Sequence, residues 1–308
     1  MDSTSRSSGL RFHLEFAVVW LAVTVLMRVP RAVARVVGRA VGLAALLFLH
    51  RLRDVGQSNL KLAFPDLTQA SRTVILCGVY RNLGLQLAEF CKMSSYSVER
   101  ARELVRYEGL SNYIEARDRG RGVLILTGHL GCWEFSSFYH SLMGHQMGIV
   151  IRRLDNPLID AMVNHIRCLH GNKVLHKDDF ARGIIAEVRA GGTVGILMDT
   201  NMTPPQGVFV PFFGVSACTA SGMARVARKT GAAVLPGFLL WESSEKRYVL
   251  HFGKEIEVTA TRDQEEDAKL NTARFTEIIE SYVRRYPDQW LWMHRRWKTR
   301  PSGECGIY

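Results

Sequence analysis

The stretch VLILTGHLGCWEF, residues 123–135, decides the fold class of this chain. Val123 to Thr127 form an apolar run of the kind that becomes a buried strand, and a helix is expected from Cys132 to Met143. A buried strand that passes directly into a helix is typical of α/β proteins, whose parallel strands are covered on both faces. We therefore expect a strand, a tight turn and a helix here.

The same alternation continues along the chain and predicts a largely parallel central sheet flanked by helices. Further strands are expected over 104–107, 148–151, 174–175, 193–198 and 233–240, and helices over 68–93, 111–119, 157–170, 179–189, 221–230 and 272–285. The prolines at 204, 205 and 211 predict a loop. RYVLHFG (247–253) and EIEVT (255–259) predict a hairpin or an edge pair.

Composition places the chain among globular proteins with an anionic partner. Its 308 residues are 47% hydrophobic and 22% charged, enough for one large α/β core. Forty Lys and Arg against 29 Asp and Glu give a net charge of +11, which favours nucleic acid, an acidic membrane face, a phosphorylated substrate or an acidic carrier protein. The six scattered cysteines form no C-x-x-C pair, which argues against a zinc site and for a reducing, cytosolic compartment.

The N-terminal residues 1–53 are expected to form a helical, membrane-associating segment ahead of a catalytic domain over 54–308. FAVVWLAVTVLM (16–27) covers only about 18 Å as a helix and spans a bilayer only by recruiting its flanks. Arg31, Arg35 and Arg39 then recur on one helical face opposite valines and alanines, a pattern typical of a helix lying in a membrane interface. A pair of core-packing helices and a cleaved signal peptide are the alternatives.

His129 and Glu134 lie too far apart around one helix to meet. They can approach only if His129 occupies the turn after the strand and Glu134 the first helical turn. Gly128 and Gly131 permit that turn. Ligands bind at the carboxyl ends of strands in such sheets, and a histidine steadied there by a carboxylate is suited to be a general base.

Other chemistries have weaker support in the sequence. A structural histidine that caps a turn is the simplest alternative. No H-E-x-x-H motif and no third ligand of recognisable spacing support a metal site, and the G-x-S-x-G motif of serine hydrolases is absent. Cys132 as a nucleophile rests only on its closeness to His129.

GHLGCWE carries the H-x-x-x-x-[DE] signature of glycerolipid acyltransferases, and the chain as a whole resembles the lipid A biosynthesis (lauroyl/myristoyl) acyltransferase family, which is related to phosphatidylinositol mannoside acyltransferases. Six blocks carry the resemblance in the same order: SNLKLAFPDLT, YRNLGLQLAEF, IRRLDNPLID, ILMDTNMTPPQGVFVPFFG, ARVARKTGAAVLPGF and YPDQWLWMHRRWKTRP. Together with the signature they cover nearly the whole chain.

The resemblance implies an acyltransferase that uses His129 as the base. An acyl chain would pass from an acyl-carrier-protein or acyl-CoA thioester to a hydroxyl of a membrane lipid, most simply a lipid A precursor. A lysophospholipid, an aminolipid or another glycolipid is the alternative acceptor. Either Glu134 or Asp199 would orient the histidine, and in the second case Glu134 would pair with Arg152 or Arg153. No metal or bound redox cofactor is expected.

Candidate substrate-binding residues follow two of the strands. Arg152 and Arg153 lie at a strand end, where an arginine can bind a phosphate or carboxylate in a forked geometry. Asn156 belongs to the same block, although it can simply start the next helix. The resemblance adds Thr219 and Ser221, and it makes Phe209, Phe212 and Phe213 candidates for an acyl groove or for the core.

The stretch WLWMHRRWKTR, residues 290–300, mixes tryptophans with cations. Such a segment can bind single-stranded nucleic acid, rest at a membrane interface or meet an acidic carrier protein. The resemblance favours the last two, so we expect an anionic lipid surface and no nucleic acid as partner. It also implies a location at the cytoplasmic face of the bacterial inner membrane.

Overall fold

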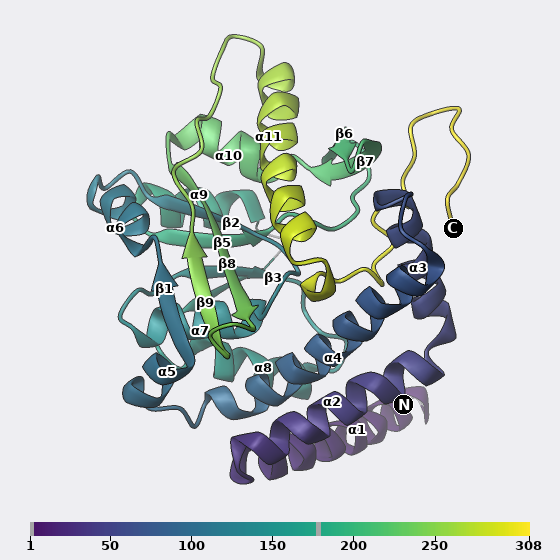
Figure 1. Cartoon of the computed structure of the whole chain (residues 1–308). Helices are drawn as coiled ribbons and strands as arrows, with labels where there is room; N and C mark the ends of the chain where they lie inside the picture. The colour runs from purple at the N-terminus through teal and green to yellow at the C-terminus, as the bar shows by residue number, and fades with distance from the viewer. Residues whose placement is uncertain (1–2, 177–179) are drawn as a thin grey trace.

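The computed structural model describes residues 3–176 and 180–308. Within them, seven strands form one sheet in the order β1-β9-β8-β2-β5-β3-β4, and β6 and β7 form a separate two-stranded sheet (Figure 1). The strands are β1 (Val105–Glu108), β2 (Val123–Thr127), β3 (Gly148–Ile151), β4 (Lys173–His176), β5 (Thr193–Leu197), β6 (Gly207–Phe212), β7 (Val215–Ala220), β8 (Ala233–Glu242) and β9 (Arg247–Phe252).

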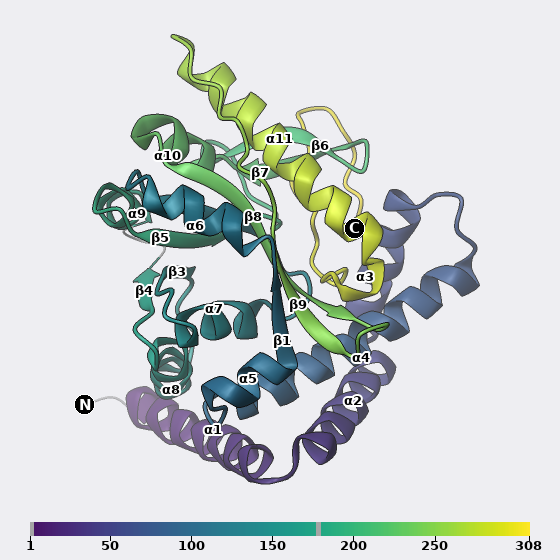
Figure 2. The same cartoon turned by 60° about the vertical axis from the view of Figure 1, so that its left-hand side comes forward.

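Helices cover both faces of this sheet, and the N-terminal helices lie outside these layers (Figures 1 and 2). They are α1 (Ser3–Arg28), α2 (Arg31–Phe48), α3 (His50–Ala63), α4 (Gln69–Met93), α5 (Val98–Leu104), α6 (Leu110–Asp118), α7 (Trp133–Leu142), α8 (Pro157–Cys168), α9 (Phe180–Arg189), α10 (Gly222–Thr230) and α11 (Gln264–Arg285), with a short 3₁₀ turn over Pro287–Gln289. The helix expected over 179–189 is α9, and Asp179 lies outside the described residues.

The prediction of a largely parallel sheet is confirmed. β4, β3, β5, β2 and β8 run parallel to one another, whereas β9 is antiparallel to β8, and β1 is parallel to β9. The central strand β2 is buried on both faces, as its apolar run predicts. Leu124 and Leu126 pack in one cluster with α9, α10 and α11, and Val123 and Ile125 pack in another with α6, α7 and α8.

Two predictions about strands in the second half of the chain are wrong. Residues 207–220 form the β6–β7 hairpin where a loop was expected through Pro211. The proline is tolerated because β6 has an outer edge that needs no partner for its missing N–H. RYVLHFG, as β9, pairs with β8 and not with EIEVT. In the latter segment, Ile256 forms a single bridge to Val234.

Helix α2 packs tightly against α4, and α3 continues through the expected boundary at residue 53 without a break. A Cβ at Gly42 would lie 2.1 Å from the carbonyl oxygen of Tyr80, and one at Gly84 would lie 2.0 Å from that of Gly38. Only glycine permits this backbone approach. The crossing therefore depends on the small residues of both helices.

The arginine face of α2 points inward and its valine face points outward. Arg31 and Arg35 donate to Glu89 of α4, whose side chain is fully buried, and the Arg35 guanidinium stacks over the Trp241 ring at 4.7 Å. Arg39 remains exposed, together with the valines of the outer face: Val33, Val36, Val37 and Val41. The expectation that all three arginines face solvent or lipid headgroups is therefore wrong for Arg31 and Arg35.

Helix α1 packs against α4 and α8, on the side of the molecule away from α10 and α11 (Figures 1 and 2). Its segment Gly9–Arg28 is long and apolar enough to cross a membrane, and none of it is buried. Polar contacts attach it to the body. Lys92 donates to the carbonyls of Met27 and Val29, each over 2.7 Å, at the C-terminal end of the helix. Asn156 donates to the carbonyl of Phe12 over 2.9 Å.

Candidate active site

The register of the sheet brings His129 and Asp199 together. β2 and β5 are parallel neighbours in which Thr127 pairs with Leu197. His129 and Asp199 each lie two residues further on, at the carboxyl ends of their strands, where parallel α/β sheets bind ligands. The site thus follows directly from the pairing of two buried strands.

Asp199 is the acid that contacts His129. Nδ1 of His129 lies 2.8 Å from Oδ1 of Asp199, and the backbone N–H of His129 donates to Oδ2 over 2.6 Å. Because the carboxylate only accepts, Nδ1 carries the ring proton and Nε2 is left as the basic atom. The Asp199 side chain is 2% exposed and that of His129 is 26% exposed, so the acid is buried and the imidazole reaches solvent.

The charges around the pair favour a basic imidazole. Burial disfavours the imidazolium, but the charge of Asp199, its hydrogen bond and the charge of Glu134 together raise the pKa of His129 above its ordinary value. Burial also acts to raise the pKa of Asp199, but the histidine ring, the Trp290 indole and the backbone N–H of His129 lower it to about 2. The carboxylate is therefore ionised whenever the histidine is neutral.

Glycine is required at positions 128 and 131 of the turn for two different reasons. A Cβ at Gly128 would lie 3.0 Å from the Asp199 carboxylate, so its absence leaves room for the acid. Gly131 has φ = 65°, and a Cβ there would lie 2.0 Å from the carbonyl oxygen of Leu239. Gly131 must therefore be glycine for the turn to pass against β8 and start α7.

Glu134 lies in the first turn of α7 but faces α8 rather than the imidazole. Its carboxylate accepts from Arg167, over 2.8 Å from Nε and 2.5 Å from Nη2. The expectation that Glu134 pairs with Arg152 or Arg153 is therefore wrong. Sequence reasoning missed Arg167 because it lies 33 residues away on a different helix, and only the docking of α7 on α8 brings the two together.

The three candidate substrate-binding residues that follow β3 lie in two different environments. Arg152 and Arg153 are exposed at the carboxyl end of β3, the same edge of the sheet as His129. Asn156 instead caps α8, accepting from the N–H of Leu158 over 3.0 Å, while its amide donates to α1. Asn156 therefore starts the helix, the simpler of its two expected roles, and its side chain is already engaged.

Thr219 and Ser221 are buried and engaged within the protein. The Thr219 hydroxyl accepts from Arg296, and the Ser221 hydroxyl donates to the Gln206 carbonyl over 3.2 Å. Phe212 and Phe213 belong to the core, and Phe209 is half-buried. These surroundings give the two hydroxyls a structural role and leave no open acyl groove along Phe212 and Phe213.

The WLWMHRRWKTR segment is not an exposed binding surface. Trp290, Trp292, Trp297 and Arg296 are at most 1% exposed. The Arg296 guanidinium stacks over the Phe212 ring at 5.0 Å. The expectation that these tryptophans meet a membrane or a carrier protein is therefore wrong. The sequence carries no signal for the contact that Trp290 makes with Asp199, because the two are 91 residues apart.

Cys132 is not placed to act as a nucleophile. Its side chain is 1% exposed, and burial raises the pKa of the thiol well above its ordinary value. Among the described residues, no three His, Cys, Asp or Glu side chains gather as a metal site would require.

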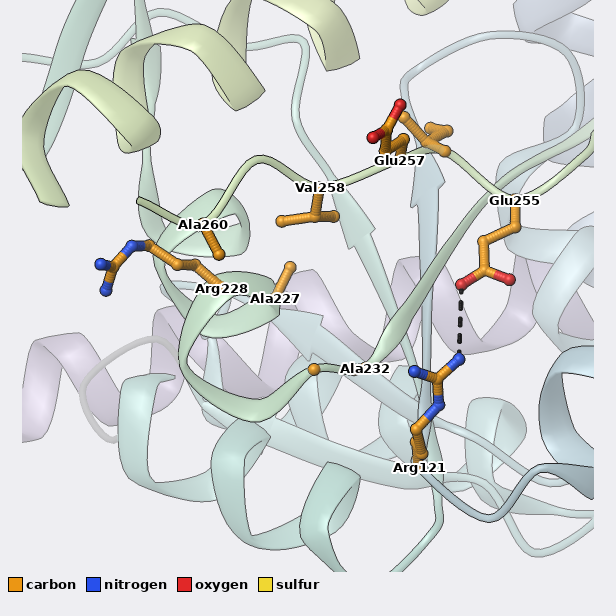
Figure 3. A pocket seen from close by; sticks show the side chains of 10 residues that line it. Arg121, Ala227, Arg228, Ala232, Glu255, Glu257, Val258 and Ala260 are labelled. Carbon is orange, nitrogen blue, oxygen red and sulfur yellow. Dashed lines mark ion pairs between the residues drawn. The ribbon is translucent and has the colours of Figure 1, made fainter. Parts of the chain in front are cut away.

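A cavity of about 430 Å³ lies at the opposite edge of the sheet (Figure 3). Arg121 precedes β2, Ala232 precedes β8, and Glu255 and Val258 follow β9. Arg121 and Glu255 approach to 3.9 Å between Nη2 and Oε1. Because the cavity opens at the amino ends of β2 and β8, it is separate from the site at His129.

Comparison with known proteins bears on the reaction. The family model described as bacterial lipid A biosynthesis acyltransferase matches residues 5–299. The lipid A biosynthesis palmitoleoyltransferase of Escherichia coli (strain K12) is 29% identical over 300 residues, 96% of each chain. The lauroyltransferase of the same strain is 27% identical over 312 residues, 100% of each chain, and its myristoyltransferase is 24% identical over 250 residues, 81% of this chain and 76% of that protein.

Proposed function

The chain belongs to the bacterial lipid A biosynthesis acyltransferase family, and from that premise we propose that it moves a fatty acyl chain from an acyl-carrier-protein thioester to a hydroxyl of a lipid A precursor. Acyl-CoA is the alternative donor. The observation that supports the proposal is the His129–Asp199 pair, with the acid buried and the imidazole reaching solvent.

The proposed reaction is a direct transfer. Nε2 of His129 takes the proton from the acceptor hydroxyl while its oxygen attacks the thioester carbonyl. As the tetrahedral intermediate collapses, the new ester C–O bond remains, the C–S bond breaks, and the imidazolium gives its proton to the leaving thiolate. Asp199 keeps the proton-bearing Nδ1 turned away from the substrate and stabilises the imidazolium.

The first turn of α7 supplies the electrostatic part of this proposal. It begins at Trp133, four residues after His129, and its N-terminal N–H groups and dipole favour the negative charge that develops on the carbonyl oxygen. Glu134 and Arg167 would act on the same turn by fixing α7 against α8. Arg152 and Arg153, exposed at the same edge, would bind an anionic group of the acceptor.

The proposed location is the cytoplasmic face of the inner membrane, with α1 and α2 as the contact surface. The apolar segment Gly9–Arg28 and the valine face of α2 are both exposed. Helices α1 and α2 lie on the same side of the molecule (Figure 2). Soluble monomers rarely expose two neighbouring apolar helix faces to water. The net charge of +11 favours an anionic lipid surface.

Transfer assays with defined donors test the reaction. The full-length chain in detergent is given lauroyl, myristoyl and palmitoleoyl thioesters of acyl carrier protein and of CoA, with a lipid A precursor as acceptor. Mass spectrometry should detect a product heavier by one acyl unit. H129A and D199N should each lower kcat by roughly 10²- to 10⁴-fold, the usual contribution of a positioned base.

Two results would contradict this proposal. Full activity of H129A would remove His129 from the mechanism, and an acyl group trapped on the protein would exclude direct transfer. A product formed only with a lysophospholipid or an aminolipid would replace the acceptor while leaving the chemistry in place.

Co-sedimentation with vesicles of anionic phospholipid tests the membrane surface. A variant carrying V36D and V37D should bind at least about tenfold more weakly. It loses two apolar contacts with the lipid, and a loss of about 1.4 kcal/mol in binding free energy is a factor of ten in affinity. L270D is the control and should bind as the wild type does, because Leu270 is exposed on α11, a helix on the opposite side of the molecule from α1 and α2 (Figure 2). Equal binding by all three would overturn the proposed surface.

A further inference from the structure

The segment that follows α11 returns to the loop carrying His129. Gly131 donates its N–H to the carbonyl of Gln289 over 3.0 Å, and Leu291 donates its N–H to the carbonyl of His129, also over 3.0 Å. These two bonds bracket a bridge between Leu130 and Trp290. The turn between β2 and α7 is thus held by backbone from a region some 160 residues later in the chain.

The side chain between those two bonds reaches the catalytic acid. The indole N–H of Trp290 donates to Oδ2 of Asp199 over 2.8 Å. The ring is 1% exposed and packs against Trp292 at 4.6 Å and Phe212 at 5.5 Å, both edge-to-face. Because the indole is fixed by this packing, its N–H has one direction in which to donate.

This contact accounts for the orientation of the carboxylate. Oδ2 of Asp199 accepts from two donors, the backbone N–H of His129 and the indole of Trp290, while Oδ1 faces the imidazole. Two fixed donors on one oxygen resist rotation of the carboxylate about its Cβ–Cγ bond. They also spread its negative charge, which moderates its pull on the imidazole proton.

We infer that Trp290 is a positioning residue of the acyl-transfer site, which holds the Asp199 carboxylate in the orientation that fixes His129. The inference rests on the proposed role of His129 as the base. It gives the buried tryptophan segment a part in the reaction that its composition does not suggest.

Other charged groups near the pair keep their partners when the indole is changed. Glu134 pairs with Arg167. His294 accepts from the N–H of Asn201 through Nε2 over 2.8 Å, and burial lowers its pKa, so it is neutral. Arg296 donates to the carbonyl of Cys218 over 3.0 Å. A change in the titration of His129 after substitution of Trp290 therefore reports on Asp199.

The test is W290F with W292F as its matched control. Both substitutions keep an aromatic ring and remove one buried indole N–H, but Trp292 donates to the carbonyl of Pro287 over 2.7 Å and not to the acid. The titration of the His129 ring is followed by NMR in the full-length chain with labelled histidine, and kcat/KM is measured against pH with lauroyl-acyl carrier protein and the lipid A precursor.

W290F should lower kcat about tenfold, part of the 10²- to 10⁴-fold contribution of a positioned base. Loss of the indole N–H concentrates charge on Asp199, so the titration of His129 and the acidic limb of the rate profile should both move up by roughly half a pH unit. W292F keeps an aromatic ring against Trp290 and leaves the indole bond to Asp199 in place, so both midpoints should move much less than in W290F, even where W292F lowers the melting temperature.

Equal midpoints in W290F and the wild type, or equal shifts in W290F and W292F, would overturn the inference and reduce Trp290 to a packing residue. The NMR titration needs no acyl transfer, so it separates this failure from failure of the proposed function. H129A serves as the reference: activity retained by that variant would remove the proposed base, whatever the two tryptophan variants do.

Discussion

Two segments of this chain that combine apolar residues with arginines, helix α2 and residues 290–300, place them in opposite ways. In α2, the valines face outward and Arg35 faces inward, onto a buried carboxylate. In the segment 290–300, the tryptophans are buried, and Arg295 and Lys298 remain exposed. The first sequence suggests contact with a membrane, and the second suggests contact with a membrane or a carrier protein, yet only the first leaves its apolar face free.

The difference shows that partners, rather than composition, decide which face is buried. Arg35 can turn inward because Glu89 and the Trp241 ring receive its guanidinium. Arg296 is buried as well, where a carbonyl, a hydroxyl and the Phe212 ring receive it. An amphipathic segment can therefore bury its polar face when the fold supplies hydrogen-bond partners for the polar groups on that face.

Replacing one tryptophan at each end of the chain tests this contrast most strongly. W297A removes a fully buried indole and should lower the free energy of unfolding by about 3–5 kcal/mol. W20A changes a side chain of α1 that is 50% exposed and should alter it by less than about 0.5 kcal/mol. Denaturant unfolding of the full-length chain in detergent measures both, and similar losses would erase the distinction between the two regions.

The next largest effect concerns the acid beneath α2. E89Q should lower the free energy of unfolding by about 3 kcal/mol, because Arg31 and Arg35 then lack their buried counter-charge. E103Q, which removes an exposed pair with Arg100, should change it by less than about 1 kcal/mol. If E89Q unfolds like E103Q, the inward arginines do not hold α2 in place.

A smaller loss is expected where α2 crosses α4. G42A places a methyl group 2.1 Å from the Tyr80 carbonyl oxygen and should cost about 1–3 kcal/mol through helix displacement. Gly9 of α1 has no heavy atom within 4 Å of an added Cβ, so G9A should leave the melting temperature unchanged or slightly higher. A neutral G42A would mean that the crossing is looser than its glycines indicate.

The smallest expected effect is on pH dependence, and it compares the proposed site at His129 with helix α1. The proposed base, His129, has to be neutral to accept a proton, and its pKa is raised, so kcat/KM should fall with decreasing pH through a midpoint above the ordinary histidine value of about 6.5. W20A should leave that midpoint within about 0.2 pH units of the wild type. A larger shift in W20A would couple the N-terminal helix to the base.

Much of the fold can be predicted because β2 and its parallel neighbours are buried on both faces and read as apolar runs. The β6–β7 hairpin was missed because Pro211 signals a loop unless the strand is known to have a free edge. β9 was paired with the wrong segment because sequence proximity favoured EIEVT, whereas the preceding strand β8 was its partner.

The candidate site likewise has parts that local sequence predicts and parts that it does not. The turn that carries His129 and the strand that ends before Asp199 are visible in local sequence, and the sheet register joins them. The partners of the two acids are not visible: Arg167 and Trp290 reach Glu134 and Asp199 through helix docking and a chain reversal. Local spacing carries no information about either contact.

The bridge between residues 289–291 and the turn at His129 also imposes an order on biosynthesis. Folding during translation proceeds from the N-terminal side, so every strand of the sheet leaves the ribosome before the indole that donates to Asp199. A nascent chain can thus present α1 and α2 while the turn at His129 still lacks its backbone partners. Under the proposed mechanism, competence for acyl transfer is among the last properties that the growing polypeptide acquires.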